Sequence, residues 1–518
     1  MSISRRDFLW RVGQAGGYSA AFVTMQTLGL LPVSASFAQA IDAPSGVGKS
    51  TRVVVIGGGI GGLTTAYEAR KLGFDVTLLE ARNRAGGRAW SAKCGDVVEF
   101  ADGTKQPITW SEGLYQNMGP ARLPSVHKTM LGYCRELNVP LEVEINTSRS
   151  TLLQNDAVND GKPYLQRKVI NDTRGQVSEL LSKTIARGAL DEELSSEDRD
   201  RLLTALRSYG SLDKSNKYKG SPRADISQFP GAGPQSMIVN EETIPIRNLL
   251  DANFWSFELY EEQWDWQATM MQPVGGMQAI SNALARALGP LVEFDAPVTE
   301  IAKTAKGVRV TYDKGGTSKS IEADYAVCAM PLTILRKIKA ELGADHRRVV
   351  DTAQYRSSCK VPWESRRFWE TDYNIYGGLS FLSKGPSPIW YPSAGLLSER
   401  GIIVAGYMDE VSGGFDRLTL AEKFEASRAQ IEKLHPGHGK ELEKPIFCGW
   451  RHVKWNEGSW AAGMSPQDYD TITSPDGSIY FAGDHTSHLV GWQEGAALSG
   501  KRAMQMICDR VRSAPTTS

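Results

Sequence analysis

Three glycines, Gly57, Gly59 and Gly62, have the spacing of a turn that could bind phosphates. They form a GxGxxG pattern between a β-branched run at 52–56 and a stretch of helical character at 61–72. In such a turn the first glycine permits the sharp bend, the second lets the backbone approach a pyrophosphate, and the third allows helix and strand to pack closely. The helix N-terminus would then present free N–H groups to the phosphates. The pattern therefore predicts a dinucleotide-binding turn.

An acid follows at the position that suits a ribose. Glu80 ends a second expected strand, 75–80, and lies 80 − 57 = 23 residues after Gly57, near the ~20 expected for a residue that accepts bonds from ribose hydroxyls. Its charge would repel a 2′-phosphate, which disfavours NADP. Strand, glycines, helix, strand and acid in this order are far more specific than the glycines alone. The pattern leaves both FAD and NAD open.

The residues after Glu80 favour FAD through a resemblance. The run 80–88, E-A-R-N-R-A-G-G-R, resembles the E-A-R-x-R-x-G-G-R segment of the flavin amine oxidase family, which includes monoamine, polyamine and L-amino-acid oxidases. The resemblance implies that FAD is bound through Ala81, Arg82, Gly87 and Arg88, with Arg88 supplying fixed positive charge near phosphate. Because no cysteine lies within 478–500, we expect the flavin to be non-covalent.

The C-terminal region resembles a second flavin segment of the same family. The run 478–484 is an expected strand ending in small residues and an acid, and a helix is expected at 494–507. Together they resemble Y-F-A-G-[ED] followed by G-W/Y-x-[ED]-G-A. The resemblance implies that the cofactor is contacted by Asp484, Gly491, Trp492 and Gln493. It also puts a glycine carbonyl, here that of Gly491, on the substrate amine and the Trp492 indole beside the substrate.

Asp484 stands where the family usually has glutamate, but the shorter side chain can still accept a bond from a ribityl hydroxyl. Three stretches in the middle of the chain, 272–277, 297–301 and 323–331, resemble segments that complete the flavin domain. The second of these implies that the backbone of Val298 lies at the adenine. The resemblance spans nearly all of residues 51–510.

The run 117–124, N-M-G-P-A-R-L-P, resembles the G-P-x-R-[LI]-P segment of L-amino-acid oxidases. The resemblance implies that Gly119, Pro120 and Ala121 line the flavin, and that Arg122 reaches over its face to bind the α-carboxylate of the substrate. A guanidinium suits this role because its planar fork pairs with a carboxylate through two parallel hydrogen bonds. A simple amine offers no carboxylate, and a lone buried arginine would then be costly. A surface salt bridge is the alternative for Arg122.

Two further stretches complete the expected site. The run 355–370 resembles Y-R-S-x-x-K…F-W-E, whose lysine holds a water near flavin N5. Lys360 is therefore the candidate for assisting reoxidation by O₂, since a cation there stabilises developing negative charge. The run 389–392, I-W-Y-P, resembles I-Y-Y-P, whose tyrosine hydroxyl shares the substrate carboxylate with the arginine. That role is assigned to Tyr391, while Trp390 replaces the other aromatic residue.

These residues must be positioned by an α/β fold. We expect a Rossmann-like FAD-binding domain of the amine-oxidase/glutathione-reductase type, with a mixed-sheet substrate domain and a helical insert. The expected ranges are 50–105, 268–345 and 470–512 for the FAD-binding domain, 106–160 and 346–469 for the substrate domain, and 161–267 for the helical domain.

The first forty residues read as an export signal. Arg5 and Arg6 begin a twin-arginine signature, a weakly apolar run follows, and A-Q-A at 38–40 resembles a cleavage site. The apolar run is too often interrupted by polar residues to span a membrane. We therefore expect the twin-arginine (Tat) machinery to export the protein, residues 1–40 to be removed, and the mature form to be periplasmic or secreted. A chance arginine pair is the alternative.

Composition excludes several classes of protein. The chain of 518 residues is too long for one core, and its 59 Lys+Arg balance 59 Asp+Glu. This neutrality gives no reason to expect nucleic acid or an anionic membrane as a partner. The six cysteines include no CxxC pair, so we expect no metal site of that type. Members of the resembling family are often dimers, which implies a homodimer.

The expected reaction is oxidative deamination of an L-amino acid to a 2-oxo acid, ammonia and H₂O₂. A hydride would pass from the substrate Cα to flavin N5, and O₂ would be the final acceptor. A monoamine or polyamine oxidase and an amino-acid 2-monooxygenase on the same scaffold remain alternatives. A non-catalytic flavoprotein and a NAD-dependent dehydrogenase are further alternatives. The sequence leaves open which amino-acid side chains are accepted.

Overall fold

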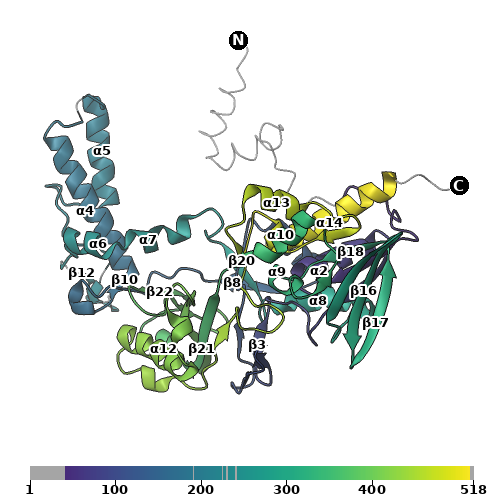
Figure 1. Cartoon of the computed structure of the whole chain (residues 1–518). Coiled ribbons are helices and arrows are strands. Elements are labelled where there is room, and N and C mark those ends of the chain that lie inside the picture. The colour runs from purple at the N-terminus through teal and green to yellow at the C-terminus, as the bar shows by residue number, and fades with distance from the viewer. Residues whose placement is uncertain (1–40, 191, 225, 229–230, 240–241, 514–518) are drawn as a thin grey trace, which may run out of the picture.

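The computed structural model describes residues 41–190, 192–224, 226–228, 231–239 and 242–513 (Figure 1). The export signal predicted at 1–40 lies outside these residues. Within the described part of the chain, no helix has both the length and the apolar character needed to cross a membrane.

A parallel five-stranded sheet gathers strands from distant parts of the chain. Its centre is β1 (Arg52–Ile56), which pairs with β2 (Asp75–Leu79) on one side and with β18 (Tyr325–Cys328) on the other. β14 (Val292–Glu293) extends the sheet beyond β2, and β27 (Ile479–Phe481) extends it beyond β18. The apolar run of β1 is buried on both faces, as expected for a central parallel strand.

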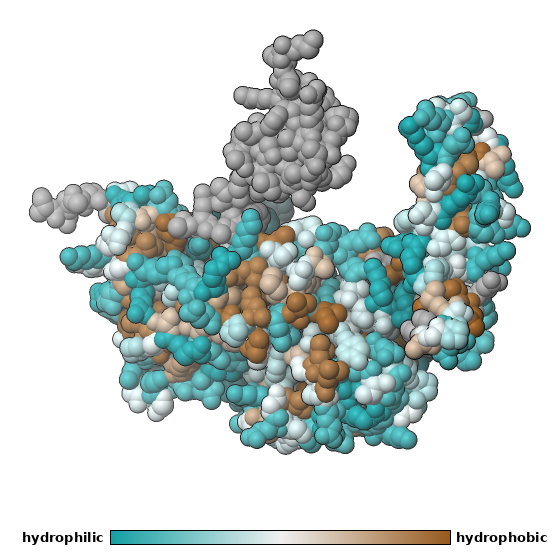
Figure 2. Space-filling model, turned by 180° about the vertical axis from the view of Figure 1, so that it is seen from behind, coloured by the Kyte–Doolittle hydropathy of each residue, from teal (hydrophilic) through white to brown (hydrophobic). Residues whose placement is uncertain are grey.

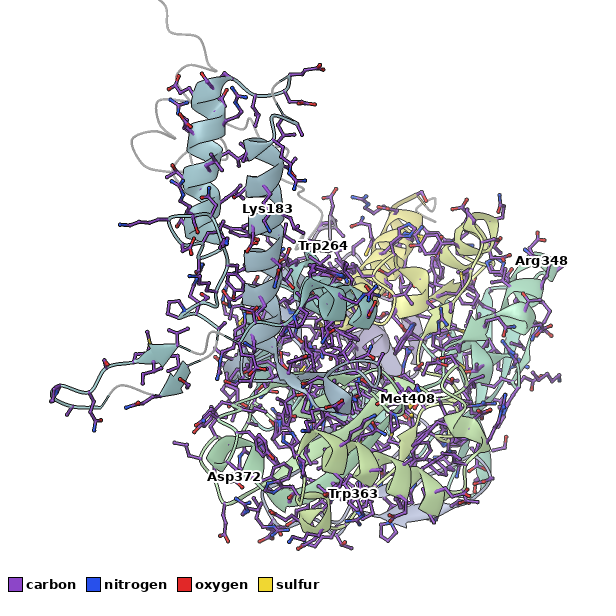
Figure 3. All side chains as sticks on the ribbon, turned by 90° about the vertical axis from the view of Figure 1, so that its left-hand side faces the viewer. Lys183, Trp264, Arg348, Trp363, Asp372 and Met408 are labelled. Carbon is purple, nitrogen blue, oxygen red and sulfur yellow. The ribbon has the colours of Figure 1, made fainter. Side chains whose placement is uncertain are left out.

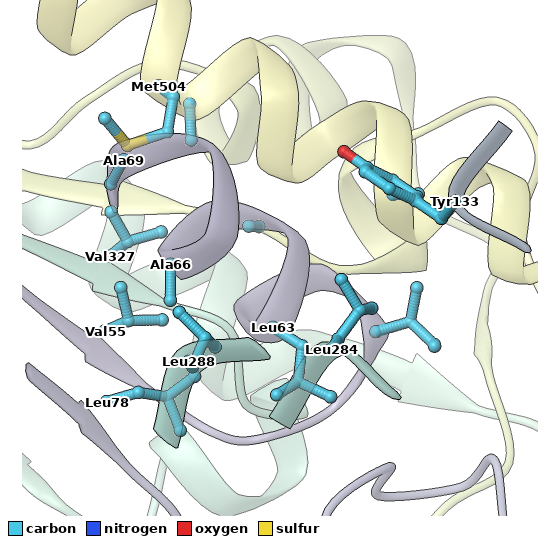
Figure 4. Packing of buried hydrophobic residues seen from close by; sticks show 14 of the residues in the cluster. Val55, Leu63, Ala66, Ala69, Leu78, Tyr133, Leu284, Leu288, Val327 and Met504 are labelled. Atoms are coloured by element: carbon cyan, nitrogen blue, oxygen red, sulfur yellow. The ribbon is translucent and has the colours of Figure 1, made fainter. Parts of the chain in front are cut away.

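Three helices pack on one face of this sheet: α2 (Ile60–Lys71), α8 (Gln278–Leu288) and α14 (Gln493–Ser513). Figure 4 shows Leu63 and Ala66 of α2 among the strand residues and the leucines of α8. Small residues bring α2 and α14 together, because a Cβ on Gly500 would lie 2.6 Å from the carbonyl oxygen of Gly61. Helix α14 begins one residue before the predicted start and continues past the predicted end at 507.

A second sheet covers the other face. It contains β17 (Thr317–Ala323), β16 (Gly307–Lys314), β15 (Val298–Thr304) and β19 (Lys339–Ala340), in that order. Residues of β1 alternate between the two layers. Val53 and Val55 pack with the helices, whereas Val54 and Ile56 pack with the second sheet. The carboxyl ends of the parallel strands stay open for a ligand, as they do in dinucleotide-binding folds.

A seven-stranded mixed sheet forms the second body. Its strands, in spatial order, are β10 (Tyr164–Leu165), β9 (Leu152–Gln154), β22 (Gly378–Leu382), β23 (Ile389–Tyr391), β24 (Arg400–Asp409), β21 (Ser358–Arg366) and β25 (Cys448–Gly449). Most neighbours are antiparallel, but β22 and β9 run parallel. Helix α12 (Leu420–Leu434) packs against it through Ile431 and Leu434.

The helical segment projects from the second body, and its base packs on that sheet where Val169 and Leu249 meet Leu153 of β9. α4 (Gln166–Ala186) and α5 (Ser196–Tyr209) form a projecting pair, and α6 (Ile246–Ala252) and α7 (Trp255–Glu258) lie at its base (Figures 1 and 3). Apolar side chains lie among hydrophilic ones on the surface of this arm (Figure 2).

A small three-stranded sheet joins the segments before and after the arm. β13 (Met270–Pro273) lies between β7 (Leu123–Pro124) and β8 (Leu141–Glu144) and pairs antiparallel with both. Arg122 immediately precedes β7, and Glu144 ends β8. These short strands therefore fix the positions of two buried charged side chains.

Candidate active site

One large cavity, with about 1310 Å³ of space including its opening, runs along the carboxyl ends of the parallel sheet. Its lining includes fourteen of the seventeen residues predicted to bind cofactor, namely Gly57, Gly59, Glu80, Ala81, Arg82, Gly87, Arg88, Gly119, Pro120, Val298, Asp484, Gly491, Trp492 and Gln493. The other three, Gly62, Ala121 and Arg122, do not line it.

The three glycines of the turn have different surroundings. Gly57 has a φ of 107°, in the region that favours glycine. A Cβ at Gly62 would lie 1.9 Å from the carbonyl oxygen of Gly57, so this glycine is needed to close the turn itself. A Cβ at Gly59 would meet no atom within 4 Å. Because Gly59 lines the cavity, this open space would let a ligand's phosphates approach the backbone.

Substitutions of these glycines should therefore separate ligand binding from folding. We expect Gly59→Val to fold normally but to lack bound flavin, because the new side chain fills the space that phosphate needs. Gly62→Ala should destabilise the fold, because its methyl group would overlap backbone. Flavin absorbance and thermal unfolding of both purified variants test this. A Gly59→Val protein with a full complement of flavin would contradict the assignment.

Glu80 is bonded within the turn that it follows. Its carboxylate accepts the backbone N–H of Gly58 at 2.6 Å and that of Arg82 at 2.8 Å. The side chain is buried at the edge of the cavity. Glu80 thus holds the glycine turn against the end of β2, a role in addition to the ribose contact that its spacing predicts.

Two arginines of the 80–88 run connect the N-terminal and C-terminal parts of the site. Arg82 donates to Oδ1 of Asn456 at 2.6 Å. Arg88 forms an ion pair with Asp484 at 2.5 Å, and Asp484 also accepts the N–H of Gly491 at 3.1 Å. Burial raises the pKa of Asp484, but the charges of Arg88 and His485 and the hydrogen bonds from Arg88 and Gly491 together hold this pKa below its usual value. Asp484 is therefore a carboxylate that fixes the loop before α14.

Lys360 is a buried cation at the cavity wall. Its Nζ donates to the carbonyl oxygens of Asn117 and Gly119, both at 2.7 Å. The rings of Trp390 and Tyr407 lie 4.9 and 5.3 Å from Nζ. Burial lowers the pKa of Lys360 to about 7, and the charge of Arg122 acts in the same direction. An ammonium has three donors, so one remains for a water or ligand in the cavity.

Arg122 is buried and bonded to no countercharge, although the buried carboxylate of Glu144 lies close enough for the two charges to interact. It is 6% exposed, and the structure gives its guanidinium no hydrogen bond or ion pair with any described residue. It is held instead between two indoles, with its Cζ 3.9 Å from the ring centroid of Trp390 and 4.7 Å from that of Trp266. Trp266 in turn lies 5.3 Å from the ring of Trp492, which lines the cavity. Arg122 therefore adjoins the cavity through Trp266 and Trp492.

The structure does not bring Tyr391 to this site. Tyr391 is fully buried on the opposite face of β23, where its hydroxyl bonds to Ser380 Oγ at 2.9 Å and His435 Nε2 at 2.7 Å. Successive side chains of a strand point to opposite faces, so Trp390 is the residue that faces Arg122. The prediction that the Tyr391 hydroxyl shares the substrate carboxylate is therefore wrong, because this hydroxyl lies on the other face of the strand and is bonded to Ser380 and His435.

Tyr391→Phe should consequently affect stability and not catalysis. We expect a loss of about 1 kcal/mol in the free energy of unfolding, because a buried hydrogen-bonding hydroxyl is removed. The kcat/KM should stay at the wild-type value. Denaturant unfolding and steady-state kinetics of the same preparation measure both quantities. A large fall in kcat/KM with unchanged stability would return Tyr391 to the site.

Several cavity residues had no clear signal in the sequence. Tyr407 lies beside Lys360 because β24 pairs with β21 in a register that sets these two residues opposite each other. Trp450 and Ser459 line the cavity from the loops that follow β25. Only the tertiary pairing brings these residues together.

Known proteins resemble the chain over most of its length. An L-amino-acid oxidase of Echis ocellatus is 27% identical over 488 residues, which cover 90% of this chain and 91% of the relative. An L-amino-acid oxidase of Pseudechis australis is 26% identical over 487 residues, covering 88% of this chain and 86% of the relative. The likeness thus extends over the cavity and over both bodies of the fold.

Solved structures show the same fold. A putrescine oxidase bound to putrescine has a TM-score of 0.59 at 19% identity and covers 90% of this chain and 99% of its own. A triple mutant of that enzyme gives 0.60 at 19% identity, with 89% and 99% covered. The sequence pattern of the family described as flavin containing amine oxidoreductase matches residues 60–508. With its glycine turn, its long cavity and this match, the chain belongs to the flavin-containing amine oxidoreductase family.

Proposed function

We propose that the protein is an L-amino-acid oxidase that uses non-covalently bound FAD and O₂. It would convert an L-amino acid to the 2-oxo acid, ammonia and H₂O₂. The relatives named L-amino-acid oxidase support this proposal at 26–27% identity. The observation that carries it is Arg122, a buried guanidinium that forms no hydrogen bond or ion pair with any described residue.

Burying the guanidinium charge of Arg122 costs free energy that a ligand of opposite charge could return. An unpaired buried ion loses several kcal/mol of solvation in real proteins, and stacking on aromatic rings returns only part of it. A carboxylate ligand would supply the missing charge and accept two parallel hydrogen bonds from the guanidinium. The two indoles on Arg122 already fix its plane, so little side-chain entropy is lost on binding. Arg122 is thus prepared for an α-carboxylate.

The residues of the cavity support the binding of a flavin dinucleotide. Gly57 and Gly59 would admit the pyrophosphate, Glu80 would meet the ribose, and Arg88 would add positive charge near the phosphates. The flavin, when bound, supplies the acceptor for two electrons from the substrate. The space at Gly59 that no protein atom fills is the observation that fits such a ligand.

The chain itself would bind and orient the substrate. Arg122 holds the carboxylate, the carbonyl of Gly491 orients the amine, and the Trp492 indole excludes water beside the substrate. Of the acids that line the cavity, Glu80 and Asp484 are both already bonded. With no free carboxylate there to act as a base, the substrate amine would need to be neutral at the moment of reaction. Positioning then supplies much of the rate.

A polyamine oxidase is the second candidate, because the solved structures that share the fold include putrescine oxidase. An amino-acid 2-monooxygenase is a third, distinguished by an amide product. The test is peroxide release from the twenty L-amino acids, their D-isomers and the matching decarboxylated amines. Peroxide from L-amino acids alone would support the proposal. Peroxide from amines alone would overturn it.

Export and assembly extend the proposal to the whole protein. Residues 1–40 would direct the folded, FAD-loaded enzyme through the Tat machinery to the periplasm or beyond, and the mature protein would be a homodimer. N-terminal sequencing of the mature protein and its mass in solution measure these two properties directly.

A further inference from the structure

A second chamber lies next to Arg122 and contains a buried carboxylate. It has about 390 Å³ of space including its opening, and its lining includes Ala121, Glu144 and Trp390. Ala121 precedes Arg122 in the chain, and Trp390 is the indole on which the guanidinium stacks. Asn117 also lines the chamber, and its carbonyl accepts from Lys360 at the cavity wall. The chamber and the main cavity are therefore neighbours around the proposed carboxylate site.

Glu144 is the unusual residue of this chamber. It is 3% exposed, and its carboxylate forms no ion pair with a described residue, the Trp390 side chain being the nearby hydrogen-bond donor that acts on it. Glu142, on the same strand, accepts a bond from Gln272 at 2.9 Å. Burial raises the pKa of Glu144 to about 7, although Arg122, Trp390 and Lys360 all act in the opposite direction. The surrounding protein thus offsets only part of the free energy that burying the Glu144 carboxylate costs.

Arg122 and Glu144 do not neutralise each other. No ion pair forms between these two side chains, although both are buried and the charge of Arg122 lowers the pKa of Glu144. The guanidinium and the carboxylate both lie beside the Trp390 indole. Because they form no ion pair with each other, each can bind a ligand group of opposite charge. An amino acid with a cationic side chain carries both groups that are needed, a carboxylate for Arg122 and a cation for Glu144.

We propose that Glu144 selects L-amino acids whose side chains end in a cation, such as L-lysine, L-ornithine or L-arginine. The α-carboxylate would bind Arg122, and the side chain would extend past Trp390 into the chamber to reach Glu144. This inference rests on the proposed oxidation of L-amino acids. It adds that L-glutamate and L-aspartate are excluded, because their side chains would bring a second negative charge beside Glu144.

L-Lysine and L-norleucine form a matched pair for the test, since norleucine keeps the carbon chain and lacks the terminal amine. The wild-type enzyme should have a kcat/KM at least 10-fold higher for L-lysine, the lower end of what a charge-assisted hydrogen bond contributes. Glu144→Gln should lower kcat/KM for L-lysine by about 10- to 100-fold and leave L-norleucine unchanged. Glu136→Gln removes the same charge from the surface, where Glu136 pairs with Lys71, and should change neither substrate.

Other results have separate meanings. If the wild-type enzyme oxidises L-norleucine as well as L-lysine, the inference fails while the proposed function stands. If Glu144→Gln slows both substrates equally, Glu144 only balances the charges of Arg122 and Lys360, and the inference also fails. If cadaverine, which is L-lysine without its carboxylate, is the better substrate of the wild-type enzyme, the proposed function itself fails. The wild-type comparison decides the matter even when the variant does not fold.

Discussion

Arg122→Ala is expected to lower kcat/KM for an L-amino acid on the order of 10³-fold, because it removes the buried partner of the substrate carboxylate. Arg122→Lys should recover little of this loss. A lysine keeps the charge but lacks the planar fork that the two indoles hold in place. Both variants should retain flavin, since Arg122 does not line the main cavity. Steady-state kinetics and flavin absorbance measure these effects.

The control for Arg122 is another arginine that stacks on an aromatic ring. Arg174 lies over Tyr209 at 5.5 Å in the projecting arm, so Arg174→Ala removes a similar contact far from the cavity. Its kcat/KM should equal that of the wild type. An Arg122→Ala enzyme that retains full activity on L-amino acids would show that this arginine binds no substrate.

Lys360→Met is expected to slow reoxidation of the reduced flavin by O₂ on the order of 10²-fold, while reduction by substrate changes little. The methionine keeps most of the side-chain volume but removes the cation that stabilises negative charge developing on oxygen. The wild-type rate of reoxidation should fall as the pH rises through about 7. Burial lowers the pKa of Lys360 to about 7, so its charged form is lost above that value. The variant should lack this pH dependence.

Stopped-flow mixing of the reduced enzyme with O₂ measures reoxidation alone. Lys423→Met is the matched control, since Lys423 is also a buried lysine beside aromatic rings but pairs with Glu410 at 2.7 Å. This control should lose stability and keep the wild-type rate of reoxidation. Equal reoxidation rates in the wild type and in Lys360→Met would remove Lys360 from the oxygen reaction.

The glycine turn could be predicted from the sequence because its chemistry is local. Strand, turn and helix follow one another within 52–71, so the pattern lies in one short stretch of the chain. The C-terminal strand and helix were predictable for the same reason. That they lie beside the N-terminal turn could be expected only from the resemblance to a known family. In the structure β27 pairs with β18, which pairs with β1, and no local sequence pattern predicts this pairing.

The substrate side of the site was less predictable. Tyr391 and Trp390 are adjacent, and a shift of one residue in a strand exchanges its two faces. The sequence alone could not fix which face of β23 meets Arg122. No local sequence pattern distinguishes Glu144, because its role depends on its burial in the folded chain without an ion-pair partner among the described residues. Trp266 reaches Arg122 only through the fold of the segment that follows the arm.

The most direct test of the account compares how fast an L-amino acid and its decarboxylated amine reduce the flavin without O₂. Anaerobic stopped-flow absorbance measures this step for the wild type and for Arg122→Ala. We expect fast bleaching of the wild-type flavin by the amino acid, slow bleaching by the amine, and loss of most of this difference in the variant. Equal bleaching of the wild-type flavin by both compounds would contradict the central claim that Arg122 recognises an α-carboxylate.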